Sequence, residues 1–132
     1  AHAPSKVKAT TKAVKKLYPE RKLIACLELH TFSSLNKEFL PHYKHTLNTA
    51  DIAVVYFNPH TIEHKKLPLI TKDDVKKGFD NPNLQVFESS EELQNFLKGQ
   101  NYQNTNLLMM SSGNFANMPL QELANSFTQN NG

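Results

Sequence analysis

Side chains that could bind a ligand gather in four short polar stretches of the sequence, each of which directly follows an apolar run. The stretches are 30–34, 58–68, 88–90 and 111–117. Apolar runs of this length are typical of strands buried on both faces in a parallel sheet. Because ligands bind outside the carboxyl ends of the strands in such sheets, these four stretches are where we expect a site.

The first stretch favours an anion site. His30 follows the run LIACLEL, and the hydroxyls of Thr31, Ser33 and Ser34 come next. Hydroxyls together with backbone N–H groups at the start of a helix can bind an anion. The alternative is a plain serine N-cap, with His30 at the rim of the sheet.

The last stretch has the residue types of a ligand-binding turn. Gly113 permits close approach of the backbone to a ligand, and Ser111, Ser112 and Asn114 offer hydrogen-bond donors and acceptors. The alternative is a strand-to-helix turn that binds nothing.

Several other chemistries are not supported. The first of the four glycines is Gly78, and neither G-x-G-x-x-G nor G-x-x-x-x-G-K-[ST] occurs, so no phosphate-binding glycine loop is expected. The motif G-x-S-x-G is also absent, which argues against a Ser-His-Asp hydrolase. Cys26 lies inside an apolar run and is interpreted as a structural core residue.

Histidines raise the question of a metal site. His60 and His64 lie four residues apart, and His42 and His45 are potential additions. The spacing comes without a carboxylate pattern on what reads as a polar loop, so no metal site is predicted.

The pattern of the chain predicts alternating helices and strands around these stretches. Strands are expected at 23–29, 52–57, 84–87 and 106–110. Helices are expected at 4–18, at 35–47 with a kink or a break at Pro41, at 71–78, at 89–99 and at 120–127. Residues 58–70 read as a polar loop and 128–132 as a frayed tail. The order predicts an α/β fold, a Rossmann-like, doubly wound and mainly parallel sheet with helices on both faces.

Length and composition indicate one domain over residues 1–132. Hydrophobic residues make up 39% and charged residues 20%, as in globular domains. No apolar run approaches 18 residues and no signal peptide opens the chain, so a membrane span is not expected. A single cysteine favours a reducing, cytoplasmic setting. The net charge of +3 rests on 14 lysines and one arginine, which does not favour nucleic acid as a partner.

Three segments resemble the C-terminal domain of the Mur ligases, the ATP-dependent amide ligases of peptidoglycan synthesis. Residues 1–4 (AHAP) resemble the end of the family motif Asp-Asp-(Phe/Tyr)-(Ala/Gly)-His-His-Pro. Residues 27–33 (LELHTFS) are similar to Pro-His-(Arg/Thr)-Tyr-(Ser/Thr)-Arg, and Ala50-Asp51 before an apolar strand also matches. Ala3, Leu29 and Ser34 replace a histidine, a proline and an arginine of these motifs.

The fourth strand and its loop point to one branch of the family. Residues 109–115 (MMSSGNF) are closer to Met-Ser-Asn-Gly-Gly-Phe than to Gly-Ala-Gly-Asp. The former occurs in the ligase that joins L-alanyl-γ-D-glutamyl-meso-diaminopimelate, recovered from old wall, to UDP-N-acetylmuramate. The latter occurs in the ligase that adds L-alanine, which remains an alternative. An independent flavodoxin-like binding module is the other alternative.

The resemblance implies roles for particular residues. His2 would face the nucleotide, and the substrate would be bound by His30, Thr31, Ser33, Ser111, Ser112 and Asn114. It implies no catalytic residue in this domain. ATP and Mg²⁺ would be bound mainly by a central domain, and UDP-N-acetylmuramate by an N-terminal domain. A chain that starts inside a motif and without methionine is expected to be a domain excised from a larger ligase, and to be inactive alone.

Overall fold

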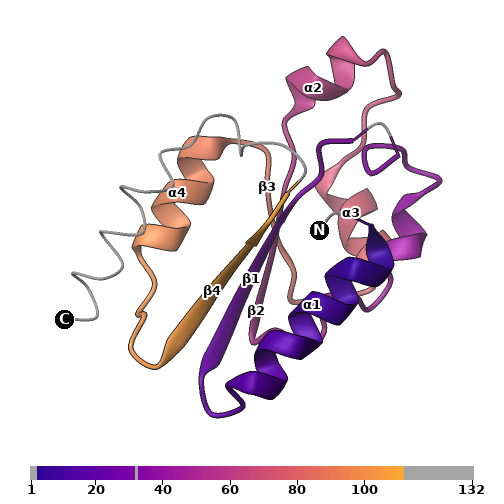
Figure 1. Cartoon of the computed structure of the whole chain (residues 1–132). Helices are drawn as coiled ribbons and strands as arrows, with labels where there is room; N and C mark the ends of the chain where they lie inside the picture. Colours follow the sequence, from indigo (N-terminus) through magenta and orange to yellow (C-terminus); the bar gives the residue numbers. More distant parts are fainter. Residues whose placement is uncertain (1–2, 32, 112–132) are drawn as a thin grey trace.

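The apolar runs of the sequence form a parallel sheet in the computed structural model, which describes residues 3–31 and 33–111 (Figure 1). Its strands are β1 (Lys22–Glu28), β2 (Ile52–Tyr56), β3 (Gln85–Phe87) and β4 (Thr105–Met110). They lie in the order β3-β2-β1-β4, and every neighbouring pair is parallel. The central position of β1 explains its nearly continuous apolar sequence, because it is covered on both faces and both edges.

Helices connect these strands and cover the sheet. They are α1 (Pro4–Leu17), α2 (Pro59–His64), α3 (Lys72–Phe79) and α4 (Ser90–Lys98), with a short 3₁₀ helix η1 (Leu40–Tyr43). Several begin as the sequence predicts: Pro4 occupies the first turn of α1, and Ser89 caps α4. At α3, Thr71 and Asp74 form a reciprocal capping box.

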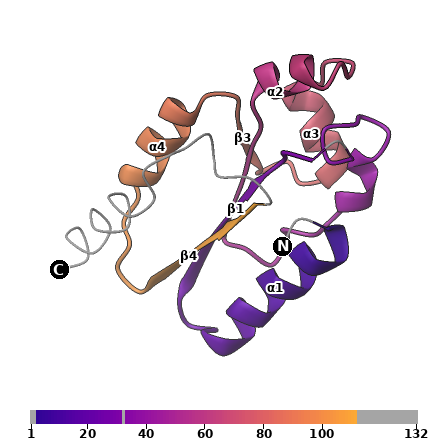
Figure 2. The same cartoon turned by 45° about the horizontal axis from the view of Figure 1, so that its top comes forward.

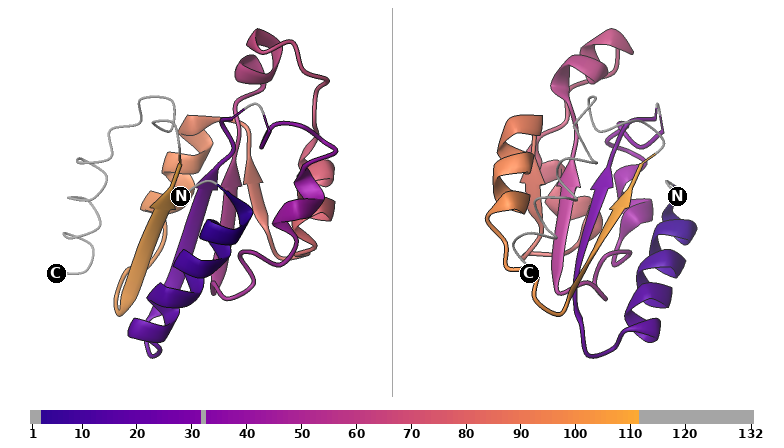
Figure 3. Two further views of the ribbon diagram at one scale, coloured as in Figure 1. Left: turned by 45° about the vertical axis from the view of Figure 1, so that its right-hand side comes forward. Right: turned by 60° about the vertical axis from the view of Figure 1, so that its left-hand side comes forward.

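The sheet separates two apolar cores. Ala25 and Leu27 of β1 point to one face, where they pack with residues of α1, η1 and α3. Ile24 and Cys26 point to the other face and pack with residues of α4. Figures 2 and 3 show α4 on one side of the sheet and α1 on the other. The α/β, Rossmann-like fold with helices on both faces is therefore confirmed.

The prediction of a helix at 35–47 is wrong, since the only helical residues there are Leu40–Tyr43, which form a 3₁₀ turn. The segment instead runs through successive i to i+3 turns, such as His42 N–H to Phe39 O at 2.9 Å. Pro41 lacks the N–H of a continuous helix, and His45 adopts φ 63°, which ends any helix. Three of the apolar residues that suggested a helix, Leu35, Tyr43 and Leu47, are nevertheless buried, and Phe39 is partly buried, because turns bring them to the core as well.

Two further boundaries differ from expectation. The loop expected at 58–70 contains α2, a six-residue helix that buries only Ile62. Gly78 was expected to end the third helix but lies inside α3, which continues to Phe79 and ends at Asp80 with φ 51°. The reason for a glycine at 78 is packing: a Cβ there would lie 2.7 Å from Leu40 Cβ.

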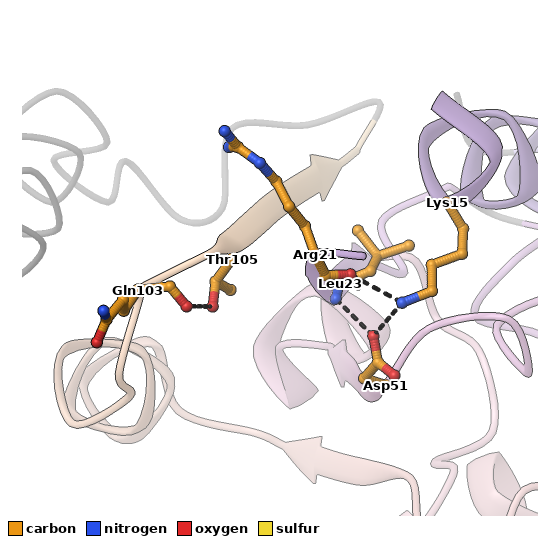
Figure 4. A network of polar contacts seen from close by, with 6 residues as sticks. All are labelled: Lys15, Arg21, Leu23, Asp51, Gln103 and Thr105. Atoms are coloured by element: carbon orange, nitrogen blue, oxygen red, sulfur yellow. Dashed lines mark hydrogen bonds and ion pairs between the residues drawn. The ribbon is translucent and has the colours of Figure 1, made fainter. Parts of the chain in front are cut away.

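A carboxylate joins the elements at the amino end of the sheet (Figure 4). Asp51 Oδ2 accepts hydrogen bonds from Leu23 N–H at 2.7 Å and from Lys15 Nζ at 2.8 Å. Lys15 Nζ also donates to the carbonyl of Arg21. Burial acts to raise the pKa of Asp51, but these hydrogen bonds and the lysine charge outweigh it and lower that pKa. Asp51 thus connects the end of α1 to the starts of β1 and β2.

Candidate functional site

The carboxyl ends of the parallel strands form one edge of the sheet, and the predicted ligand-binding stretches meet there. His30 follows β1, α2 follows β2, and Ser111 follows β4. Figure 1 shows α2 beyond this end of the strands. We call this region the carboxyl edge.

A hollow of about 400 Å³ opens at the carboxyl edge between the end of β1 and α2. It is lined by His30, His60, Thr61, His64 and Lys65. The side chain of Asn58 accepts the N–H of His60 at 2.9 Å and so starts α2. One turn then places His60 and His64 on the same side of the helix.

The charge of this hollow suits an anionic group. Lys65 brings a basic side chain to it, and no carboxylate is among the lining residues. The nearest acid on the helix is Glu63, whose Oε2 lies 3.8 Å from His60 Nδ1 on the exposed surface. Histidine and lysine side chains can bind a carboxylate or a phosphate through charge-assisted hydrogen bonds, and here they outnumber the one exposed acid of the helix, Glu63.

Thr31 closes a tight turn and does not start a helix, so the helix start expected at this stretch is wrong. Its Oγ1 accepts the N–H of Ser34 at 3.1 Å, and its carbonyl accepts the Ser34 hydroxyl at 3.1 Å. Ser34 is buried, whereas Ser33 is exposed. The Thr31 hydroxyl therefore stabilises the loop that carries His30, and Ser33 is the hydroxyl that faces solvent.

Ser111 lies against a buried acid. Its Oγ donates a hydrogen bond to Oε1 of Glu28, the last residue of β1. Glu28 is only 4% exposed. This pair joins the ends of β1 and β4 at the carboxyl edge.

Sequence reasoning did not assign Glu28 to the site. The signal was present, because Glu28 is the only charged residue in the run 23–29. A carboxylate is costly to bury and persists in a strand only where partners compensate it. His60, His64 and Lys65 were also missed as neighbours of His30, since α2 was read as loop.

The other two described histidines, His42 and His45, do not line this hollow. His45 Nε2 is 2.7 Å from Asp80 Oδ2, near the end of α3. His42 contacts Phe39 with tilted rings, whose centroids lie 4.7 Å apart. Within residues 3–31 and 33–111, no group of three or more histidines, cysteines or acids is placed to hold a metal ion.

Three of the predicted site residues, His2, Ser112 and Asn114, lie outside the described residues. Cys26 is fully buried in the core under α4, as expected. Burial, and secondarily the charge of Glu28, raises the pKa of its thiol well above the usual range. Such a thiol is unreactive at neutral pH. In the described part of the chain, no helix has the length and apolarity needed to cross a bilayer.

The chain is similar in sequence to known ligases, although no protein-family model matches it. The relatives include the UDP-N-acetylmuramate–L-alanine ligases of Streptococcus pneumoniae strains Hungary19A-6 and CGSP14. Each is 27% identical over 113 residues, a match that covers 73% of this chain and 25% of the ligase. The chain thus spans about a quarter of the length of the curated relatives it matches.

A solved structure shares the fold. It is a crystallised domain described as part of a UDP-N-acetylmuramate:L-alanyl-γ-D-glutamyl-meso-diaminopimelate ligase from Haemophilus ducreyi 35000HP. The match has a TM-score of 0.59 at 20% identity and covers 96% of this chain and 85% of that domain. The expected resemblance is confirmed: this chain is similar in sequence to Mur ligases and has the fold of a Mur ligase domain.

Proposed function

We propose that this chain is the C-terminal, substrate-binding domain of an ATP-dependent ligase. The ligase joins L-alanyl-γ-D-glutamyl-meso-diaminopimelate, a recycled murein tripeptide, to UDP-N-acetylmuramate. The observation that carries the proposal is the carboxyl edge. There, His30 and Ser111, which the resemblance assigns to the substrate, lie at the same end of the sheet as a cationic hollow.

The chemistry of the tripeptide matches this edge. Its diaminopimelate and glutamate residues carry carboxylates, which the histidines and Lys65 of the hollow can bind. Thr31 would hold the His30 loop in place, and Ser33, Ser112 and Asn114 would contribute hydrogen bonds from neighbouring loops. The role of this domain is then to bind and orient the incoming amine, which raises the rate by proximity.

The described residues do not fit Mg-ATP. No glycine-rich loop follows β1, and no acidic cluster is placed to hold a cation within the described ranges. Activation of the carboxylate as an acyl phosphate therefore belongs to other parts of the enzyme, where ATP and Mg²⁺ would be bound. In this arrangement His2 would approach the nucleotide from the start of the chain, and no residue of this domain is catalytic.

Ligase assays of the full-length protein that contains this chain test the proposal. The reaction holds UDP-N-acetylmuramate, Mg-ATP and the tripeptide, and the product is identified by mass. We expect the tripeptide adduct to form together with one phosphate per product. Absence of product with the tripeptide and with L-alanine would refute the ligase assignment.

The sequence relatives favour a second candidate, the ligase that adds L-alanine. The same assay separates the two, since L-alanine replaces the tripeptide in a parallel reaction. A larger kcat/KM for the tripeptide supports the first candidate. The reverse ratio supports the second, in which the hollow would meet only the single carboxylate of L-alanine.

A further inference from the structure

Glu28 is the only charged residue buried in the described part of the chain. It ends the central strand and so lies at the carboxyl edge, beside the residues proposed to bind substrate. Burial of a carboxylate in place of a leucine or valine costs stability unless hydrogen bonds or charges compensate it. The hydrogen bond from Ser111 compensates part of this cost and connects Glu28 to a residue of the proposed site.

The neighbours of Glu28 define where its carboxylate lies. In the sheet register Glu28 is paired with Tyr56 of β2, and Leu27 is paired with Met110, the residue before Ser111. Glu28 therefore lies between Tyr56 on one side and Ser111 on the other. Burial and then the charge of Glu28 raise the pKa of Tyr56, which agrees with a carboxylate on the α4 face of the sheet.

The hydrogen bond between Glu28 and Ser111 fixes the direction in which the Ser111 hydroxyl donates its proton. A serine hydroxyl has one proton, and here that proton is donated to Oε1 of Glu28. The Ser111 oxygen is consequently an acceptor toward any ligand. An acceptor polarised by a carboxylate favours a donor group, above all an ammonium or an amide N–H.

We propose that Glu28 is a positioning residue, which fixes Ser111 as a hydrogen-bond acceptor for an amino group of the incoming substrate. The inference rests on the proposed function and deepens it. The hollow of α2 would take the carboxylates of the substrate, and the Glu28–Ser111 pair would orient an amino group. Glu28 would affect the substrate through Ser111.

Kinetics of three variants in the full-length ligase test this role. Glu28→Leu and Ser111→Ala should each raise KM for the amine substrate roughly 10-fold or more, the equivalent of one charge-assisted hydrogen bond. The KM values for ATP and UDP-N-acetylmuramate should stay within about 2-fold of those of the parent enzyme. A tenfold change, by comparison, corresponds to about 1.4 kcal/mol. Glu28→Gln keeps an oxygen that accepts the Ser111 proton and should restore most of the affinity.

The double variant Glu28→Leu with Ser111→Ala provides the matched control. Because Glu28 acts through Ser111, its KM should equal that of Ser111→Ala alone. The proposal would be overturned if the double variant raised KM by the product of the two single effects. It would also be overturned by equal changes in all three KM values, or by a Glu28→Gln variant as impaired as Glu28→Leu.

A second readout does not depend on ligase activity. In the 132-residue chain, Glu28→Leu should shift the backbone amide NMR signal of Ser111 and speed its hydrogen exchange, whereas Glu28→Gln should leave both unchanged. An unchanged Ser111 signal in Glu28→Leu would overturn the positioning role even if the ligase is active. A wild-type protein without ligase activity would instead refute the proposed function, while this measurement still decides whether Glu28 positions Ser111.

Discussion

Two carboxylates at opposite ends of the sheet, Asp51 at the surface and Glu28 in the interior, have different tasks. Asp51 at the amino end is bound by Lys15 and by the N–H of Leu23, so it holds α1 and the strands together. Glu28 at the carboxyl end contacts Ser111, which belongs to the proposed site. In a parallel sheet the amino end generally contributes stability, and the carboxyl end binds ligands.

Removal of the charge of Asp51 should destabilise the fold. Asp51→Asn weakens the hydrogen bonds to Lys15 and Leu23, and we expect unfolding free energy to fall by about 1–2 kcal/mol after solvent screening of an exposed pair. Urea unfolding at pH 7 measures the change. Glu38→Gln, at an exposed acid, is the control and should change stability by less than about 0.5 kcal/mol.

The same variant has a defined pH dependence. The pKa of Asp51 is lowered in the folded chain, so the stabilisation is fully present above its ordinary value of 3.8 and is lost as pH falls further. The difference in stability between wild type and Asp51→Asn should therefore shrink below about pH 4, within the normal range of carboxyl titration. A difference that stays constant down to pH 2.5 would show that the carboxylate charge is not the cause.

At the scale of elements, the sequence was most informative for the strands. All four were predicted within one or two residues, because each contains a short, mainly apolar run flanked by turn residues. The short helix α2 could not be predicted, since one turn and a half with a single buried residue, Ile62, has no measurable periodicity. The prediction for segment 35–47 failed for a different reason. Its apolar spacing fits a helix, but Pro41 and tertiary packing favour turns.

The packing of α3 against η1 can be tested at a single glycine. In Gly78→Ala the new methyl group would lie 2.7 Å from Leu40 Cβ and 3.0 Å from its carbonyl. We expect a net loss of about 1–3 kcal/mol, although alanine favours helix by roughly 1 kcal/mol. Thermal unfolding should show a melting temperature lower by several degrees.

Gly99→Ala is the matched control for this prediction. Gly99 ends α4 with φ −81°, and a Cβ there would meet only Asn95 O at 3.4 Å and Phe96 O at 3.6 Å. Its stability should be unchanged or higher by up to about 1 kcal/mol. If the two variants changed stability equally, contact with Leu40 would not be the reason why position 78 requires glycine.

For the whole molecule, the fold class and the grouping of the polar stretches at the carboxyl edge followed from the alternation of apolar runs and helices. The site itself was predicted only in part. His30 and Ser111 were expected at the edge and lie there, but their partners Glu28 and α2 come from distant positions that only the folded sheet brings together. Sequence spacing carries no information about such contacts.

The chain alone should not bind nucleotides tightly. Phosphate binding by backbone N–H groups needs a glycine-rich loop, and none follows the strands of this sheet. Titration calorimetry of the 132-residue chain with Mg-ATP should give no binding tighter than about 1 mM, a free energy near −4 kcal/mol. Micromolar binding of ATP or of a flavin would favour an independent nucleotide-binding or flavodoxin-like module.

The central claim is that the carboxyl edge of this sheet binds the incoming amine substrate, and His30→Ala in the full-length ligase tests it most directly. KM for the tripeptide, ATP and UDP-N-acetylmuramate should be measured in parent and variant, with the exposed His42→Ala as control. We predict that only the tripeptide KM rises, by roughly 10-fold for a lost charged hydrogen bond. The melting temperature should stay within about 3 °C, because a half-buried loop residue contributes little to stability. Equal changes in all three constants, or an unchanged tripeptide KM, would contradict the account.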